Sequence, residues 1–129
     1  MPPQTTTRAA ETNLEPSVIY RVLAEPSNIP RWAPTFADAI ERVDGHFRVT
    51  KIGETFDVEV VLHPSALAVD IVRSMANNRR GGAYVRVTPR PMGGSSIAIT
   101  VPLAPNVDEA EAAKTLEQEL ADLIGLAQR

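Results

Sequence analysis

The chain has 129 residues, of which 43% are apolar and 22% are charged, and its formal net charge is -3. This length corresponds to one domain with a single hydrophobic core. The acidic balance argues against a nucleic-acid partner, and the absence of cysteine excludes disulfides, thiol catalysis and thiolate zinc sites. No apolar run approaches the ~18 residues of a membrane span, and residues 1–13 lack the layout of a signal peptide, so we expect a cytoplasmic protein.

The N-terminal part predicts a strand followed by short helices. Residues 1–4 resemble a frayed leader, which leaves a single domain over residues 5–129. The Thr-rich segment 5–12 is typical of an edge strand. Pro16 suits the first position of a helix, where its missing N–H costs nothing. The apolar residues of this helix fall on one stripe, formed by Val18, Ile19, Val22 and Leu23.

Pro26 ends the first helix, and the proline-rich stretch that follows has room only for a brief helical turn at residues 29–32. From residue 39 onward the apolar residues alternate with polar ones, which is typical of half-buried antiparallel strands. Asp44-Gly45 suits a type I′ hairpin turn, and Gly53 marks the next reversal. The predicted strands are 39–43, 46–52, 55–62, 67–73, 83–88 and 97–101, with a polar loop at 75–82 and a turn at 89–94.

The C-terminal segment predicts one long amphipathic helix of roughly twenty residues and ~30 Å. Asp108 and Glu111 have the spacing of a capping box. The apolar stripe of this helix consists of Leu116, Leu120, Leu123 and Ala127. A meander of alternating strands has one apolar face, and this helix has the matching stripe. We therefore predict an α+β fold in which a curved antiparallel sheet of about seven strands grips the helix.

The segment EPSVIY (residues 15–20) and the segment LAEPSNIPRW (residues 23–32) resemble the opening of the START-like (SRPBCC) superfamily, with the polyketide cyclase/dehydrase-like branch as the nearest. Residues 57–73 and the closing helix are similar to that family in order and spacing. The resemblance implies a helix-grip fold with a cavity for lipids, sterols, polyketides or other apolar molecules. Because the chain is short and has only six aromatic residues, a small or closed cavity is an alternative.

Two residues of the expected cavity carry polar groups. Trp32, between two prolines, either lines the cavity mouth or anchors the short helical turn to the sheet. Arg73 alternates in step with the buried residues of its strand, so its side chain is expected on the inner face. An interior arginine needs an anion as its partner. Because Arg73 lies at the end of the strand, its long side chain can also reach water. The expected ligand-binding residues are Trp32, Phe56, Val58, Val69, Ile71, Arg73, Val85, Ile99, Leu116, Leu120 and Ile124.

The titratable residues give weaker indications. His46 and His63 occupy strand ends that favour solvent, and their surroundings do not have the spacing of a metal site, so we expect neither a metal nor a cofactor. The outer face of the sheet is predicted to carry Asp57, Glu59, Asp70, Tyr84 and Arg86. If the two faces of these strands were exchanged, the carboxylates of Asp57, Glu59 and Asp70 would lie inside and become candidate general bases. The loop at residues 77–82 carries two arginines that would attract an anionic ligand at the cavity rim. Ser17, Ser95 and Ser96 lack the context of a hydrolase nucleophile.

Three functional hypotheses follow. The first is a non-catalytic module that binds a small hydrophobic or amphipathic ligand, lipid or polyketide-like, between sheet and helix. The second is a cyclase or dehydratase, which requires Arg73, Tyr84, His63 or Asp57 to face inward. The third is a protein-interaction domain with a filled core, which forms a homodimer through an exposed strand or the short helices. The fold alone does not choose among them.

Overall fold

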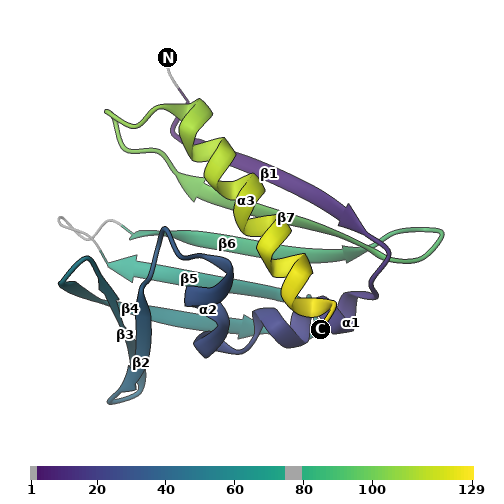
Figure 1. Ribbon diagram of the computed structural model, residues 1–129, viewed down its shortest axis with the longest axis horizontal. Coiled ribbons are helices and arrows are strands. Elements are labelled where there is room, and N and C mark those ends of the chain that lie inside the picture. The colour runs from purple at the N-terminus through teal and green to yellow at the C-terminus, as the bar shows by residue number, and fades with distance from the viewer. Residues whose placement is uncertain (1–2, 75–79) are drawn as a thin grey trace.

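The computed structural model describes residues 3–74 and 80–129. Its architecture is a seven-stranded antiparallel sheet in the order β1-β7-β6-β5-β4-β3-β2, with one long helix, α3, across one face (Figure 1). The elements are β1 (Thr5–Thr12), α1 (Pro16–Leu23), η1 (Pro26–Asn28), α2 (Ile29–Trp32), β2 (Ala39–Val43), β3 (His46–Lys51), β4 (Glu54–His63), β5 (Ala68–Ser74), β6 (Arg80–Pro89), β7 (Ser95–Pro102) and α3 (Glu109–Ala127). The predicted fold class is confirmed.

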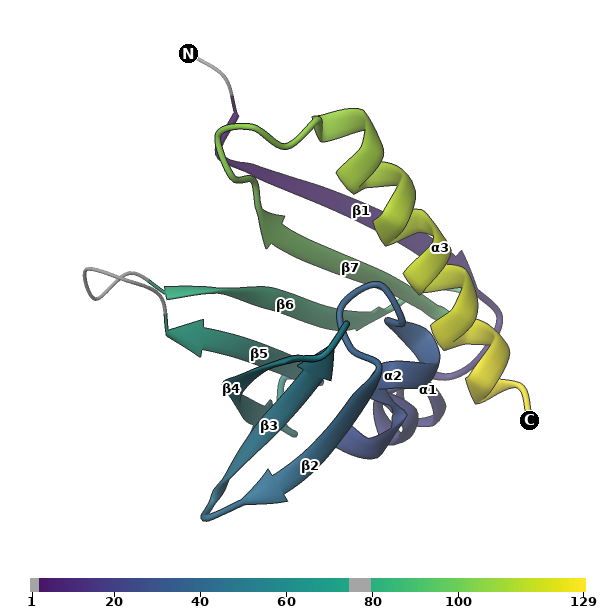
Figure 2. The same cartoon turned by 60° about the vertical axis from the view of Figure 1, so that its left-hand side comes forward.

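α3 packs on β1 and β7 at one side of the sheet and against the short helices α1 and α2 at its C-terminal end. Figure 2 shows the β2–β3 hairpin at the opposite side, turned away from α3. The helix therefore covers the β1–β7 side directly, whereas the β2–β4 side faces α2 and the loop that follows it. Within the described residues, no helix is long and apolar enough to cross a membrane.

The register places the predicted apolar residues on one face. A transverse row across the sheet runs through Leu62, Val69, Val85, Ile99 and Arg8, each directly opposite the next. We call this the inner face. Strand alternation then puts Asp70 and Tyr84, which are also directly opposite each other, on the outer face. The sequence therefore predicted correctly which of these strand residues lie on the inner face and which lie on the outer face.

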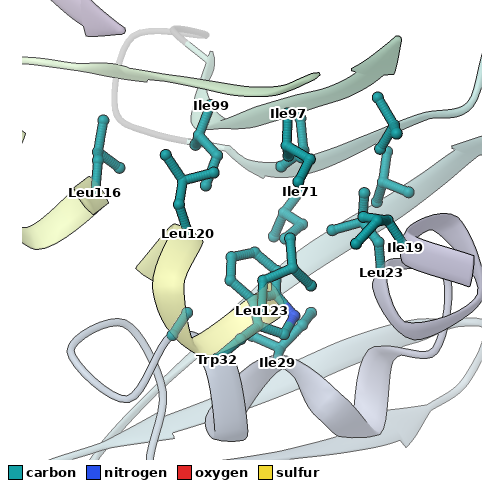
Figure 3. Close-up of a cluster of buried hydrophobic side chains, with 14 of the residues drawn as sticks. Ile19, Leu23, Ile29, Trp32, Ile71, Ile97, Ile99, Leu116, Leu120 and Leu123 are labelled. Atoms are coloured by element: carbon teal, nitrogen blue, oxygen red, sulfur yellow. The ribbon is translucent and has the colours of Figure 1, made fainter. Parts of the chain in front are cut away.

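The core forms where α1, α2 and α3 meet the inner face (Figure 3). Leucines of α3 point toward β7, α1 contributes Ile19 and Leu23, and α2 contributes Ile29 and Trp32. All four of these residues from α1 and α2 are at most 1% exposed. Burial of this apolar surface is the main force that holds the helices on the sheet.

The helix ends follow the predicted chemistry except that, among the described residues, the Glu111 side chain does not form the second bond of a capping box. Pro16 occupies the first turn of α1, and α1 ends at Leu23, before Pro26. The N-cap residue of α3 is Asp108, whose carboxylate accepts a hydrogen bond of 3.4 Å from the backbone N–H of Ala110. This bond satisfies one of the free N–H groups of the first turn.

Several strands begin or end at other residues than predicted, and three of these differences change the role of a residue. Ile52 and Leu67, expected at strand ends, have φ angles of 49° and 53° and lie in turns. Ile52 forms a two-residue turn with Gly53, as Asp44 does with Gly45. β6 begins at Arg80, so the last residues of the predicted 75–82 loop belong to a strand, and residues 75–79 lie outside the described part.

Gly82 has a specific packing role in β6. A Cβ atom at this position would collide with the backbone carbonyl oxygen of Ile71 on β5. Glycine therefore permits the close approach of these two strands beside Arg73, near the end of β5.

Candidate functional site

The first candidate site lies at the end of β5 on the inner face. The guanidinium carbon of Arg73 lies 4.0 Å from the centroid of the Phe56 ring on β4. Phe56 meets Phe36, from the loop between α2 and β2, edge to face at 5.6 Å and 73°. We call Phe36, Phe56 and Arg73 the Arg73 site. The sequence predicted both Phe56 and Arg73 on this face and missed Phe36, which precedes the alternating region.

Arg73 is exposed although its side chain lies on the inner face. Among the described residues, no carboxylate forms an ion pair with it, whereas Arg8, Arg48 and Arg90 each have an acidic partner. An arginine stacked on an aromatic ring keeps its N–H donors free at the edge of the guanidinium plane. The Arg73 site therefore combines an apolar surface with an unpaired cation.

The other predicted ligand-binding residues lie deeper. Trp32 is 1% exposed and packs beneath α3, and its indole N–H has no hydrogen-bond partner among the described residues. Ile124 is partly buried against the core. The remaining seven are at most 3% exposed and pack against one another; they are Val58, Val69, Ile71, Val85, Ile99, Leu116 and Leu120.

A second candidate site is a hollow of about 310 Å³ between α3 and the loop after α2. We call it the α3 hollow. Glu119 is 8% exposed, and its carboxylate forms no hydrogen bond or ion pair in the described part of the chain. Burial, and then the nearby charge of Asp122, raises the pKa of Glu119 to about 7. The lining residues are Pro34, Thr35, Glu111, Lys114, Thr115, Gln118, Glu119 and Asp122.

Sequence reasoning missed Glu119. It directly precedes Leu120 and lies three residues after Leu116, so it falls at the border of the apolar stripe of α3. A glutamate at that border was the available signal, but it was grouped with the solvated face of the helix.

A third hollow, of about 530 Å³, lies between η1 and the inner face of β2–β4. Its floor includes Ile40, Phe47, Val60 and Leu62, and the guanidinium of Arg42 lies 4.9 Å from the centroid of the Phe47 ring. A smaller hollow of about 420 Å³ lies beside α1 near Tyr20, whose hydroxyl has no hydrogen-bond partner in the described part of the chain.

The outer face carries ion pairs at the surface. Asp57 lies 3.3 Å from His46 Nε2 and 3.1 Å from the Arg48 side chain. Among the described residues, His46 Nε2 has no hydrogen-bond partner despite this short distance. His63 Nε2 lies 3.1 Å from Asp70 Oδ2. The cyclase hypothesis required one of four named side chains to face inward, and only Arg73 does so.

The remaining polar candidates lie apart from these sites. Glu59 and Arg86 are exposed on the outer face, as predicted. In the described residues, no three His, Asp or Glu side chains form a group that holds a metal. Of the anion-attracting loop predicted at residues 77–82, residues 77–79 lie outside the described residues and residues 80–82 belong to β6.

No protein-family model matches the chain, and no curated protein matches it in sequence. Solved structures do match. A protein from Mesorhizobium loti is similar with a TM-score of 0.72 and 19% identity, over 98% of each chain. A START superfamily protein from Mycobacterium smegmatis is similar with a TM-score of 0.69 and 13% identity, again over 98% of each chain.

The fold is START-like. The Zhui aromatase/cyclase from a Streptomyces species shares it, with a TM-score of 0.65 and 14% identity over 98% of this chain and 94% of that one. The fold expected from residues 15–32 is therefore confirmed, including its similarity to polyketide cyclase-type proteins. At these identities the likeness concerns the fold.

Proposed function

We propose that the protein binds a small amphipathic anion, with an apolar body and a carboxylate or similar acidic group, at the inner face between the sheet and α3. The observation that carries this proposal is Arg73, a cation stacked on an inner-face aromatic ring without an acidic partner among the described residues. The acidic group would pair with Arg73, and the apolar body would lie against Phe36 and Phe56.

The energetics favour such a ligand. A guanidinium donates two parallel N–H bonds to a carboxylate, and charge-assisted bonds contribute about 1.5–3 kcal/mol. The apolar body contributes ~25 cal/mol for each Å² that it removes from water. Lipid-like and polyketide-like acids both have this character. The predicted aliphatic residues, such as Ile71 and Leu116, would form the floor of the site.

The two other hypotheses remain predictions. A cyclase or dehydratase needs an acid or base beside the substrate, and arginine does not release its proton at neutral pH. A filled-core interaction domain would share the packed interior seen around Trp32. Binding measurements separate it from the proposed function, because a filled core without a ligand site takes up no small amphipathic anion.

The proposal is tested by calorimetric titration with octanoate and with 1-octanol, which has the same chain length but no charge. Arg73→Gln should weaken octanoate binding at least tenfold, since a charge-assisted pair is lost. Arg86→Gln, on the outer face, removes the same charge and should leave binding unchanged. Equal affinity for 1-octanol, equal affinity in Arg73→Gln, or no octanoate binding would each overturn the proposal.

A further inference from the structure

The α3 hollow is polar and acidic, and the Arg73 site does not account for it. Three of its lining residues are acids and one, Lys114, is a base. We propose that this hollow binds the primary ammonium group of a small organic amine, with the carboxylate of Glu119 as its anchor. This inference is independent of the proposed function, because it uses none of the residues of the Arg73 site.

The environment of Glu119 calls for a partner. A carboxylate removed from water needs hydrogen bonds or a counter-charge, and its burial is otherwise unfavourable. Lys114 lines the same hollow, but no ion pair joins it to Glu119 in the part of the chain that the structure describes. Glu119 as a whole residue is 8% exposed, and it lines an open hollow. A cation that enters from solvent would supply the missing partner.

The neighbouring groups fit an ammonium donor. An ammonium has three N–H donors and needs three acceptors. Asp122 is held by Gln118, whose amide donates to Asp122 Oδ1 at 3.0 Å, which leaves Asp122 Oδ2 available. The hydroxyl of Thr115 donates to the backbone carbonyl of Glu111 at 3.1 Å, so its oxygen can accept. Glu119 supplies the third acceptor and the charge.

Organic amines fit better than a metal ion. The acids of the hollow do not come together as a metal-holding group among the described residues. Pro34 and Thr35 form the wall opposite α3, and this wall offers the ligand an apolar ring and a methyl group. A short alkyl ammonium matches both parts, because its charge would face Glu119 and its carbon chain would face the loop.

Binding should depend on pH through Glu119. The charged groups around it on α3 are Glu111, Lys114 and Asp122, while the loop after α2 contributes uncharged Pro34 and Thr35. From β1, Arg8 pairs with Glu117 at 3.6 Å, away from the hollow. The pKa of Glu119 is about 7, so the carboxylate is mostly protonated at pH 6 and mostly ionised at pH 8. Affinity should therefore rise about tenfold between these pH values, with release of about half a proton at pH 7.

The test is a titration of the full-length protein with n-butylamine, followed by amide NMR shifts and by calorimetry in buffers of different ionisation enthalpy. We expect saturable shifts at Thr35 and along residues 111–122, tighter binding at pH 8 than at pH 6, and proton release at pH 7. Glu119→Gln should abolish binding without unfolding the protein. Glu109→Gln removes a charge from the same helix outside the hollow and should retain binding.

Three results would contradict the proposed ammonium site. They are the absence of saturable shifts at pH 8, equal binding in Glu119→Gln, and equal shifts with 1-butanol. Octanoate binding at the Arg73 site serves as an independent readout, so failure of one proposal is distinguishable from failure of the other.

Discussion

The guanidinium of Arg73 lies over the Phe56 ring at 4.0 Å, so an inner-face residue near the start of β4 and one near the end of β5 form one amphipathic surface. Both residues share the face of the buried core, yet Arg73 is exposed. The pair thus marks the border between the packed interior and the solvent-accessible part of the inner face, where a ligand can gain apolar contact and a counter-charge together.

A double-mutant cycle tests this pair. We expect Phe56→Leu to lower the free energy of unfolding by about 0.5–1 kcal/mol beyond its packing cost, because the cation–π contact is lost. In an Arg73→Gln background this additional loss should disappear. Urea denaturation of the four proteins provides the measurement, and additive effects would show that the contact contributes nothing to stability.

Glu119 should make stability depend on pH. Its folded-state pKa of about 7 exceeds the ordinary value of 4.5, so the folded state binds the proton more tightly. Protonated Glu119 therefore stabilises the folded state fully below pH 4.5, and this stabilisation is lost as the pH rises toward 7. At roughly 1.4 kcal/mol per pKa unit, Glu119→Gln should be more stable than the parent at pH 8 by about 3 kcal/mol.

The measurement is urea denaturation of both proteins at pH 4.5 and pH 8, with Glu109→Gln as the control. The difference between Glu119→Gln and the parent should be small at the lower pH and large at the higher one. A difference that does not change with pH would contradict the burial of an ionisable carboxyl at this position.

Gly82 and Gly125 should respond oppositely to alanine. At Gly82 the new Cβ meets the Ile71 carbonyl, so Gly82→Ala should destabilise the protein by about 2 kcal/mol. At Gly125, in α3, no atom lies near the new Cβ, and alanine favours the helix by about 0.8–1 kcal/mol. Thermal melting should give a lower Tm for the first variant and a higher Tm for the second. A Tm for Gly82→Ala at or above that of the parent would contradict the close approach of β5 and β6.

Ile52 occupies a left-handed turn position with φ 49° and is 81% exposed. A β-branched residue is unfavourable there by about 1–2 kcal/mol, whereas Asn-Gly is the preferred pair for such a turn. Ile52→Asn should therefore raise the free energy of unfolding by about 1 kcal/mol in urea denaturation. The backbone N–H of residue 52 still donates to Asp38 Oδ2, so the turn itself should persist. An unchanged or lower stability would refute the assigned turn geometry.

Much of the fold follows from the sequence, because strand alternation fixes which residues face the helix. Val69 and Asp70 lie on opposite faces for this reason alone. The errors at Ile52 and Leu67 arose because apolar residues in a strand-like series were assigned to the strand, although the chain reverses there in a left-handed conformation. Ile52 and Leu67 are not themselves the glycine or asparagine that normally occupies a left-handed turn position, although Gly53 follows Ile52.

The candidate sites were less predictable. Residues such as Ile71 and Leu116 are apolar whether they line a cavity or fill a core, so composition cannot distinguish these roles. Glu119 could be identified only from the three-dimensional structure, because its burial depends on the loop at Pro34, which covers one side of α3. Arg73 was predictable because a charged residue on an apolar strand face is unusual.

Intermolecular NOEs from bound octanoate test most directly whether a small amphipathic anion lies against the Arg73 site. We expect NOEs from the alkyl protons to the ring protons of Phe36 and Phe56, which disappear in Arg73→Gln and persist in Arg86→Gln. NOEs confined to Phe47 and Leu62, in the hollow beside η1, would contradict it.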